Sequence, residues 1–470
     1  MRRPNLTFDR EAFVRESRPR LVKGLIAAAV GFFLITVLSG ATLTLILAVI
    51  IGLALYVPAW DRVPFGKYVV TGTVIALAVL YPFYQPDMFE IPIFGSFPSV
   101  DTAVTMLIFI MMALGLNIVV GYAGLLDLGY VAFYAMGAYT AAWFASPHFS
   151  ESIKHFHFGA VGVNESSGGI HVSIWIVLVV AAIFTAFVGV LIGLPTLRLR
   201  GDYLAIVTLG FGEIMPQIAL NGDNLLNTGF NLTNGPQGIN PIDPPGFGTT
   251  LEDSLGLPES YLAPGDNALG LFNSSLELYF WTALLLVLFT AFCSMRLRDS
   301  RLGRAWIAIR EDETAAAAMG VPLMRTKTWA YAAGAFFGGI AGAYYASFKS
   351  GTFPADFYFN ISVFILCMVI LGGMGNIWGV IVGGGFLAYL NQEGLGNIGA
   401  WINERFSGGS AEWVQVFDEP IDVPLYQFGI FGVILVLVML FKPEGLIPSA
   451  RRKAEFEEGV HDEPLYDATK

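Results

Sequence analysis

The chain has 470 residues, of which 55% are hydrophobic and 13% are charged, and its formal net charge is -11. Soluble domains carry about 25% charged residues, so this composition excludes an ordinary cytoplasmic enzyme, a disordered protein and a nucleic-acid-binding protein. Repeated apolar runs of about 20 residues predict instead an all-α, polytopic membrane protein. The two cysteines, Cys293 and Cys367, lie in apolar runs without the spacing of a disulfide framework or a zinc site.

The chain begins with a charged segment. Residues 1–24 include seven lysines and arginines, and no A-x-A cleavage site follows the first apolar run. A signal peptide has a shorter basic region and is cleaved after small residues, so we predict a retained cytoplasmic tail. Residues 25–99 are expected to form extra N-terminal spans, and residues 448–470 a cytoplasmic C-terminal tail.

Apolar runs follow along the rest of the chain, with two conspicuous breaks. The runs lie at about 25–39, 41–58, 68–84, 102–121, 125–145, 173–195, 203–220, 279–295, 328–348, 358–373, 376–391 and 426–441. GYAGLLDLG breaks the stretch 102–145, and GGMGN breaks the stretch 358–391. Each break is either a tight turn or an interrupted, re-entrant helix that lines a cavity. We predict about ten full spans, an even number because both termini are expected in the cytoplasm.

The basic residues predict the orientation of these spans. Residues 296–327 hold seven lysines and arginines, whereas residues 221–278 hold none and carry seven acidic residues. Cytoplasmic loops of membrane proteins are enriched in lysine and arginine. We therefore expect residues 296–327 on the cytoplasmic side, and the loops 146–172, 221–278 and 392–425 on the outer side.

No motif for catalysis or nucleotide binding is present. The sequence contains no G-x-x-x-x-G-K-[ST], G-x-S-x-G or H-E-x-x-H. Without a phosphate-binding loop the chain is not expected to hold ATP by itself, and it offers no candidate catalytic residue.

Two carboxylates fall within apolar stretches, Asp127 in GYAGLLDLG and Glu213 in TLGFGEIMP. A charge at mid-membrane costs about 2.5–3.5 kcal/mol on insertion scales and normally faces a cavity or a partner. Two interpretations stay open, a role in a pore or gate and a structural polar contact. Because a proton- or sodium-driven secondary carrier would use such acids, that carrier is the alternative from a different class.

The segment 300–327 is predicted to contain a short cytoplasmic helix. Asp312 is the expected N-cap, the run Glu313–Met319 is rich in alanine, and Gly320 and Pro322 end it. So short a helix is unstable in isolation. It is either a surface helix on the membrane or a docking helix for a separate motor subunit.

Small residues recur at helical spacing in two places. Gly334, Gly338 and Gly342 stand four residues apart, and so do Gly375, Gly379 and Gly383. Each set is predicted to line one helix face, where a neighbouring helix can approach closely. Such faces serve either plain packing or helices that slide during gating.

Histidines gather in the outer loop 146–172, where His148, His155, His157 and His171 lie. His155 and His157 could pair on a metal, but no carboxylate or cysteine spacing supports such a site. We predict no metal site.

Several long segments resemble one family. The quoted segments are ALGLNIVVGYAGLLDLGYVAFYAMGAYTAAWFA (113–145), PTLRLRGDYLAIVTLGFGEI (195–214), NLTNGPQGI (231–239), RLGRAWIAIREDETAAAAMGV (301–321), SGTFPADFYF, VILGGMGNIWGVIVG and FKPEGL (441–446). They resemble the M-type permease subunit of high-affinity branched-chain amino acid importers of the ATP-binding-cassette class. The resemblance covers the permease domain 100–447, and it leaves the first spans and the loop 240–278 without a functional interpretation.

The resemblance implies partners and a mechanism. Members of the family work with a second related permease, two cytoplasmic ATPase subunits and a periplasmic amino-acid-binding protein, in the bacterial inner membrane. ATP and magnesium would be bound by the ATPase subunits, and no cofactor by this chain. Relatives that carry urea, short amides or other amino acids are the alternative within the family.

The resemblance also implies roles for particular residues. The family's coupling helix would fall on residues 310–320, with these residues at the ATPase interface: Arg310, Glu311, Asp312, Glu313, Ala316 and Gly320. The translocation path or gate would include Asn117, Gly121, Gly124 and Asp127, together with Gly210, Gly212 and Glu213. None of these residues would be catalytic.

Overall fold

The computed structural model describes residues 66–88, 94–150, 153–160, 168–199, 202–224, 230–245, 275–406, 422–442 and 444–447. The predicted tails, the first two apolar runs and most of the loop 240–278 lie outside these residues. Contacts divide the chain into two units, one drawn from Met1–Asp101 and Glu393–Val423, and the other from Thr102–Gln392 and Pro424–Lys470.

In the first unit, the segment before α4 is held between two helices, α3 (Gly66–Tyr84) and α15 (Leu395–Phe406). The Tyr81 hydroxyl donates to the Pro98 carbonyl at 2.6 Å, and the Asn397 amide donates to the Phe94 carbonyl at 2.7 Å. The Ser99 hydroxyl donates to the Glu393 carboxylate at 2.9 Å. The side chains of Tyr81 and Asn397 thus satisfy two backbone carbonyls of this segment, and the Glu393 carboxylate also accepts from the Ser99 N–H at 3.1 Å.

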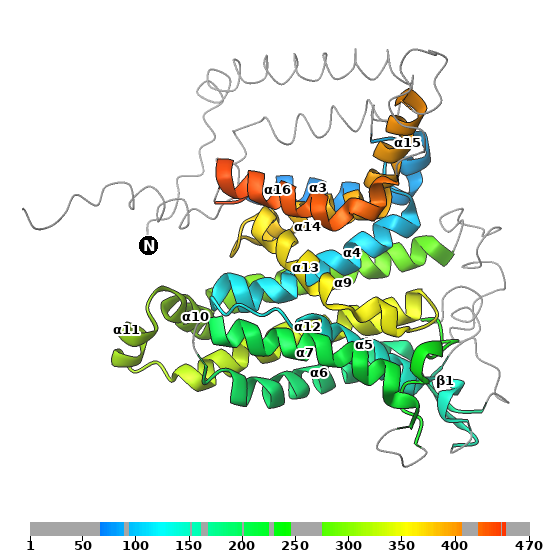
Figure 1. Ribbon diagram of the computed structural model, residues 1–470, viewed down its shortest axis with the longest axis horizontal. Coiled ribbons are helices and arrows are strands. Elements are labelled where there is room, and N and C mark those ends of the chain that lie inside the picture. The colour runs from blue at the N-terminus through cyan, green and yellow to red at the C-terminus, as the bar shows by residue number, and fades with distance from the viewer. Residues whose placement is uncertain are drawn as a thin grey trace, which may run out of the picture. The chain divides into compact units, whose positions relative to one another are not determined.

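The second unit is built around α12 (Leu323–Phe348), against which α5 (Val131–Phe144) and α6 (Ile174–Thr196) pack along much of their length. Figure 1 shows these helices side by side with α7 (Asp202–Asn221). The close approach depends on glycine: a Cβ at Gly342 would lie 2.0 Å from the Tyr134 carbonyl oxygen of α5. A Cβ at Gly339 would collide with the side chain of Thr185 in α6.

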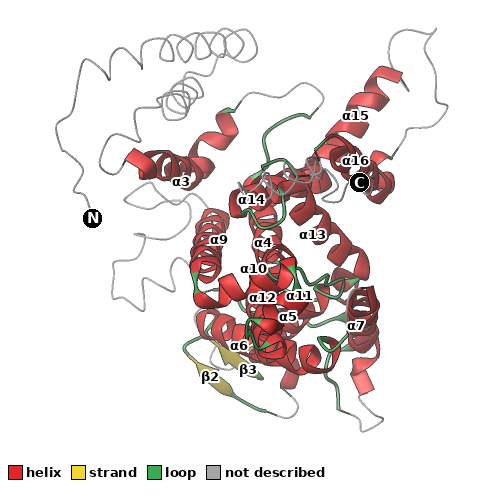
Figure 2. Cartoon of the chain, turned by 90° about the vertical axis from the view of Figure 1, so that its left-hand side faces the viewer, coloured by secondary structure: helices red, strands yellow, loops and turns green. Residues whose placement is uncertain are grey.

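The other elements of this unit complete a mostly helical fold. They are α4 (Val100–Leu116), η3 (Asn117–Tyr122, a π-helix), η5 (Gly222–Asn224), η6 (Gly235–Gln237), α9 (Ser275–Asp299), α10 (Arg301–Glu311), α11 (Glu313–Ala318), η7 (Pro354–Phe357), α13 (Phe359–Gly372), α14 (Ile377–Tyr389), η8 (Leu390–Gly394), η9 (Val423–Tyr426) and α16 (Gln427–Phe441). A small sheet has the order β1 (Ala145–Ser146), β3 (Ile170–Val172), β2 (Phe156–Phe158). Strand β3 pairs antiparallel with β1 and parallel with β2, and Figure 2 shows β2 and β3 beside α6.

The two breaks take different forms. After η3 the chain forms no helix until Val131. Along this stretch Gly124 lies against Arg310 of α10 and Gly129 against Thr208 of α7, and farther on Gly137 of α5 lies against Gly339 of α12. Residues 123–130 therefore run inward along the bundle, and α5 begins inside it: this break is an interrupted helix.

The second break is a tight turn. Helices α13 and α14 pack against each other, and the turn between them uses positive φ angles at Gly373 (111°) and Gly375 (85°), a conformation that favours glycine. The prediction that Gly375 shares a helix face with Gly379 and Gly383 is wrong, because Gly375 lies in this turn before α14 begins. Gly379 and Gly383 do lie on α14, directly against Gly372 of α13.

Five described helices are long and apolar enough to cross a membrane. They are Val100–Tyr122, Ile174–Thr196, Tyr203–Asn224, Leu276–Asp299 and Val423–Phe441. Helices α5, α13 and α14 are shorter because the breaks cut them, and further predicted spans lie outside the described residues. The all-α membrane class is confirmed, and the total of about ten spans stays a prediction.

The described part of the second unit has two chemically different ends. Figure 1 shows α10 and α11 at one end of the α5–α6–α7–α12 group and β1 at the other. Basic residues gather at the α10–α11 end, namely Arg296, Arg298, Arg301, Arg304, Arg310, Arg325 and Lys327. This separation fits the predicted cytoplasmic position of residues 296–327.

Candidate functional site

Helix α11 is a short helix with defined boundaries. The Asp312 carboxylate accepts hydrogen bonds from the Thr314 hydroxyl (2.6 Å) and from the backbone N–H groups of Thr314 (2.8 Å) and Ala315 (3.0 Å). These bonds, the Thr314 hydroxyl first, lower the pKa of Asp312 below its ordinary value. At the other end Gly320 adopts a φ of +85°. The predicted start and stop of this helix are confirmed.

The same cap corrects the predicted extent of the coupling helix. Asp312 has extended backbone angles (φ -150°, ψ 109°), so the chain leaves helical geometry between α10 and α11. Arg310 and Glu311 therefore end α10 and do not share a helix with Glu313. The segment 310–320 comprises two helices that meet at a capped corner.

On the side that faces α12, helices α10 and α11 are both bonded to α12. The Trp306 indole of α10, only 1% exposed, donates to the Thr326 carbonyl at 2.8 Å. The Lys327 ammonium, 4% exposed, lies 2.8 Å from the Glu313 carboxylate, which is 28% exposed. Ala316 is buried on the same side. Because buried charges are stable only when paired, the Glu313–Lys327 pair holds α11 in one position.

The side of α11 that faces away from α12 is exposed. Its exposed residues are Thr314, Ala315, Ala317, Ala318, Met319 and Gly320. Met319 is 86% exposed, and methionine adapts readily to a partner's surface. This uncovered surface consists of small side chains with one exposed methionine at its end.

Three of the residues predicted for the path, Asn117, Gly121 and Gly124, lie together at the first break. The Asn117 side-chain oxygen accepts a hydrogen bond from the Gly375 N–H at 2.8 Å, and Arg310 donates to the Gly121 carbonyl at 2.6 Å. Gly124 has a φ of +67° and lies against the Arg310 side chain. The structure thus brings three of the predicted path residues into contact with the second break and with the end of α10.

Asp127 lies deeper in the interrupted helix and is 1% exposed. One carboxylate oxygen accepts from the Gly129 N–H at 2.9 Å, while the other is buried without a hydrogen-bond partner. The Thr208 hydroxyl of α7 accepts from the Leu128 N–H at 3.0 Å, and the Ser362 hydroxyl of α13 accepts from the Val131 N–H at 2.8 Å. These hydroxyls satisfy the backbone that the break leaves unpaired, as the interior of a membrane protein requires.

The predicted path residues of α7 divide between two environments. Gly212 is buried against Gly129, whereas a Cβ at Gly210 would meet nothing within 4 Å. Glu213 is exposed, in contrast to the buried Asp127. The structure therefore places the two predicted carboxylates in different surroundings.

Residues 445–447, at the end of FKPEGL and just beyond it, cover the second break, a role that the sequence did not reveal. The Leu446 and Ile447 N–H groups donate to the carbonyls of Leu371 and Gly372, at 2.9 and 3.2 Å. The Asn376 amide donates to the Ile447 carbonyl at 2.8 Å. Gly445 (φ +92°) lies directly against the turn. The available signal was a glycine and a proline placed just beyond the last apolar run.

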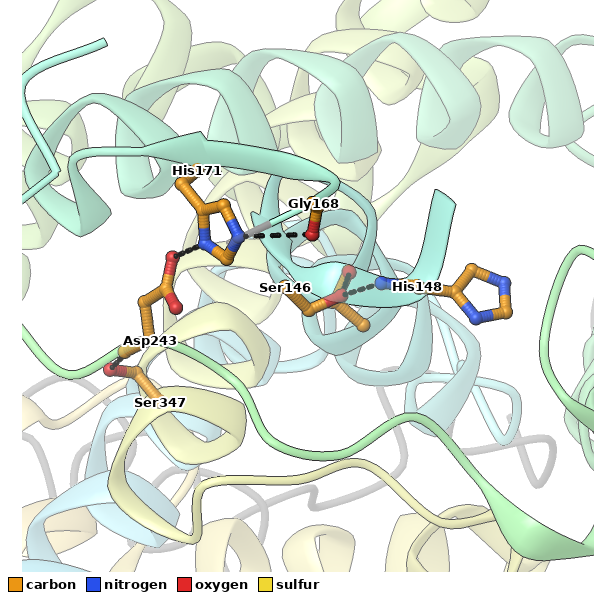
Figure 3. Close-up of polar contacts among 7 residues, drawn as sticks. Ser146, His148, Gly168, His171, Asp243 and Ser347 are labelled. Carbon is orange, nitrogen blue, oxygen red and sulfur yellow. Dashed lines mark hydrogen bonds and ion pairs between the residues drawn. The ribbon is translucent and has the colours of Figure 1, made fainter. Parts of the chain in front are cut away.

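At the opposite end, a hydrogen bond between His171 and Asp243 joins strand β3 to the loop that follows η6 (Figure 3). His171 Nδ1 lies 2.8 Å from the Asp243 carboxylate, and the Ser347 hydroxyl of α12 donates to the Asp243 carbonyl at 2.9 Å. Burial raises the pKa of the Asp243 carboxyl, and the hydrogen bond and charge of His171 oppose that rise. Within the described ranges, no group of three or more histidine, cysteine, aspartate or glutamate side chains is placed to hold a metal ion.

Comparison with known proteins places these features in a family. The model of the family described as "Branched-chain amino acid transport system / permease component" matches residues 99–439. The chain belongs to this family. The matched range contains both breaks, α10, α11 and the loops 146–172, 221–278 and 392–425.

Named relatives agree with the family match. The chain is 35% identical over 407 residues to the high-affinity branched-chain amino acid transport system permease protein LivM of Escherichia coli, covering 86% of this chain and 80% of that protein. LivM of Salmonella typhimurium gives the same identity and coverage over 406 residues. A probable branched-chain amino acid transport permease protein of Methanocaldococcus jannaschii is 26% identical over 281 residues, covering 58% and 68% of the two chains. No solved structure shows a significant match.

Proposed function

We propose that this permease-family chain is the membrane-spanning subunit of a binding-protein-dependent ATP-binding-cassette importer that moves branched-chain amino acids inward. Similarity to the LivM proteins supports the substrate class. The observation that carries the proposal is α11, a capped helix fixed to α12 on one side by the Glu313–Lys327 pair and uncovered on the other. Such a helix gives a separate motor subunit a rigid point of attachment.

The proposed complex contains a second related permease, two cytoplasmic ATPase subunits and a periplasmic amino-acid-binding protein. The chain lies in the inner membrane with both termini in the cytoplasm. ATP and magnesium bind to the ATPase subunits, in keeping with the absence of a phosphate-binding loop from this sequence.

Transport proceeds by alternating access. The loaded binding protein docks on the outer loops, and ATP brings the two motor subunits together. Their movement displaces α11, and α10 and α12 move with it because Trp306, Thr326, Glu313 and Lys327 tie the three helices together. The interrupted helix and the glycine-packed α5–α12 interface then change their tilt and open the path inward.

The proposal is tested by purifying the native complex in mild detergent through a tag on this chain and identifying its components by mass spectrometry. Recovery of an ATPase with a phosphate-binding loop and of a second permease is expected. The complex is then reconstituted into liposomes with the binding protein, and uptake of labelled leucine is measured with ATP inside. Vanadate should stop uptake, and an excess of valine, but not of urea, should compete with leucine.

Different results separate the alternatives. Competition by urea without competition by valine would move the chain to the urea and short-amide branch of the family. Recovery of this chain alone, with uptake that follows an ion gradient and resists vanadate, would refute the importer and favour a secondary carrier.

A further inference from the structure

Arg310 makes a contact that the coupling role alone does not require. Its guanidinium is half-buried and donates to the Gly121 carbonyl at 2.6 Å. Gly121 lies in the last turn of the π-helix η3, which ends one residue later at Tyr122. Carbonyls in the last turn of a helix have no partner within that helix, so Arg310 caps the end of the helix at the first break.

The second break is joined to the same point. Asn117, at the start of η3, accepts a hydrogen bond from the Gly375 N–H at 2.8 Å. A Cβ at Gly121 would lie 2.1 Å from the Asn117 side-chain oxygen and 2.7 Å from the Gly375 nitrogen. Only glycine at position 121 lets the two breaks approach so closely. We name the contact among Arg310, Gly121, Asn117 and Gly375 the junction.

The junction is also joined to the cytoplasmic corner. Arg310 lies two residues before the Asp312 cap, so its helix α10 leads directly into α11. The Trp306 bond to Thr326 and the Glu313 pair with Lys327 tie α10 and α11 to α12. A displacement of α11 therefore reaches the junction through one short, well-packed helix.

We propose that Arg310 is a positioning residue that transmits the displacement of α11 to both helix breaks. The two breaks then change conformation together when the ATPase subunits hydrolyse ATP. This inference rests on the proposed importer function. It assigns Arg310 inward, to the permease's own breaks, in place of the predicted contact with the ATPase. A charged donor on a carbonyl forms a stronger bond than a neutral one, which suits a link that must carry force.

The test compares Arg310→Gln with Arg304→Gln in the reconstituted complex. Arg304 lies on the same helix but is exposed, and it donates to the Asp299 carbonyl near the start of α10. Leucine uptake and ATP hydrolysis are measured together, and their ratio is compared with that of the unaltered complex. Because a hydrogen bond to a charged group contributes about 1.5 kcal/mol or more, which corresponds to roughly tenfold, we expect the leucine transported per ATP to fall about tenfold in Arg310→Gln, with ATP hydrolysis continuing. In Arg304→Gln the leucine transported per ATP should stay unchanged.

A second variant keeps the test decisive if Arg310→Gln does not assemble. Asn117→Ala breaks the link between the two breaks and leaves Arg310 in place, so the same loss of coupling is expected. Where all variants assemble, the double variant Arg310→Gln with Asn117→Ala should be no worse than the more severe single variant, because both act through one junction.

The outcomes separate this inference from the proposed function. Normal leucine transported per ATP in Arg310→Gln or in Asn117→Ala would overturn the junction while leaving the importer intact. A fully additive loss in the double variant would also overturn it. An unaltered complex that does not couple ATP hydrolysis to leucine uptake would instead refute the proposed function.

Discussion

Replacement of Gly342 by alanine tests how closely the central helices pack. The added Cβ would lie 2.0 Å from the Tyr134 carbonyl oxygen, 2.9 Å from the Tyr134 carbonyl carbon and 2.9 Å from the Ala138 nitrogen. All three atoms belong to the backbone of α5, so no side chain can rotate away. Ordinary contact begins at 3.4 Å, and α5 and α12 would have to separate by about 1.4 Å at this point.

The cost follows from that separation. Overpacking a well-packed core costs about 1–3 kcal/mol, and a backbone obstacle places this substitution at the upper end. Alanine regains up to about 1 kcal/mol over glycine in a helix. We therefore expect the free energy of unfolding to fall by about 2 kcal/mol, which lowers the midpoint of thermal unfolding by a few degrees.

The assay is thermal unfolding of the purified complex in detergent, and Gly432→Ala is the matched control. Gly432 lies in α16, and a Cβ there would meet nothing within 4 Å, so the control should be as stable as the unaltered chain or slightly more stable. Equal midpoints for Gly342→Ala and Gly432→Ala would refute the inferred closeness of α5 and α12.

Two further substitutions test the corner and the interrupted helix. Glu313→Lys leaves the buried Lys327, 4% exposed, beside a second positive charge. Breaking such a pair costs about 3 kcal/mol, so α11 should lose its fixed position against α12. ATP hydrolysis should then continue while leucine uptake falls. Normal uptake by this variant would contradict the role of α11 in coupling. Asp127→Asn keeps an acceptor for the Gly129 N–H and replaces the buried carboxyl oxygen that has no hydrogen-bond partner; we expect little change in the thermal stability of the complex and slower leucine uptake. A clearly lower unfolding midpoint would show that the carboxylate serves structure.

The pair of substitutions at Glu313 and Arg310 also distinguishes two steps of one mechanism. Glu313 holds α11 against α12, whereas Arg310 holds α10 against the first break. Loss of the first contact frees the attachment point of the motor. Loss of the second leaves the attachment point intact and disconnects it from the path, so the ATPase subunits should still copurify in full amount with Arg310→Gln.

The sequence by itself determined the features that depend on neighbouring residues. Apolar runs and few charges fixed the membrane class, because the cost of leaving backbone groups unpaired in lipid admits mainly helices for such runs. Asp312 and Gly320 marked the ends of α11, since a side-chain cap and a positive φ act within a few residues of the chain. Long segments around both breaks carried enough identity to indicate the family.

The tertiary structure alone decided how distant segments meet. Whether Arg310 points toward a partner or toward Gly121 depends on contacts across 189 positions of the chain, and no local pattern encodes that direction. Gly375 stands at the same spacing as Gly379 and Gly383, yet it lies in a turn, and its N–H donates to Asn117, 258 positions away in the chain. The second break is a tight turn. The first break can be an interrupted helix because hydroxyls from α7 and α13 satisfy its unpaired backbone N–H groups. Such hydrogen bonds join residues that are distant in sequence, and only the folded chain brings them together.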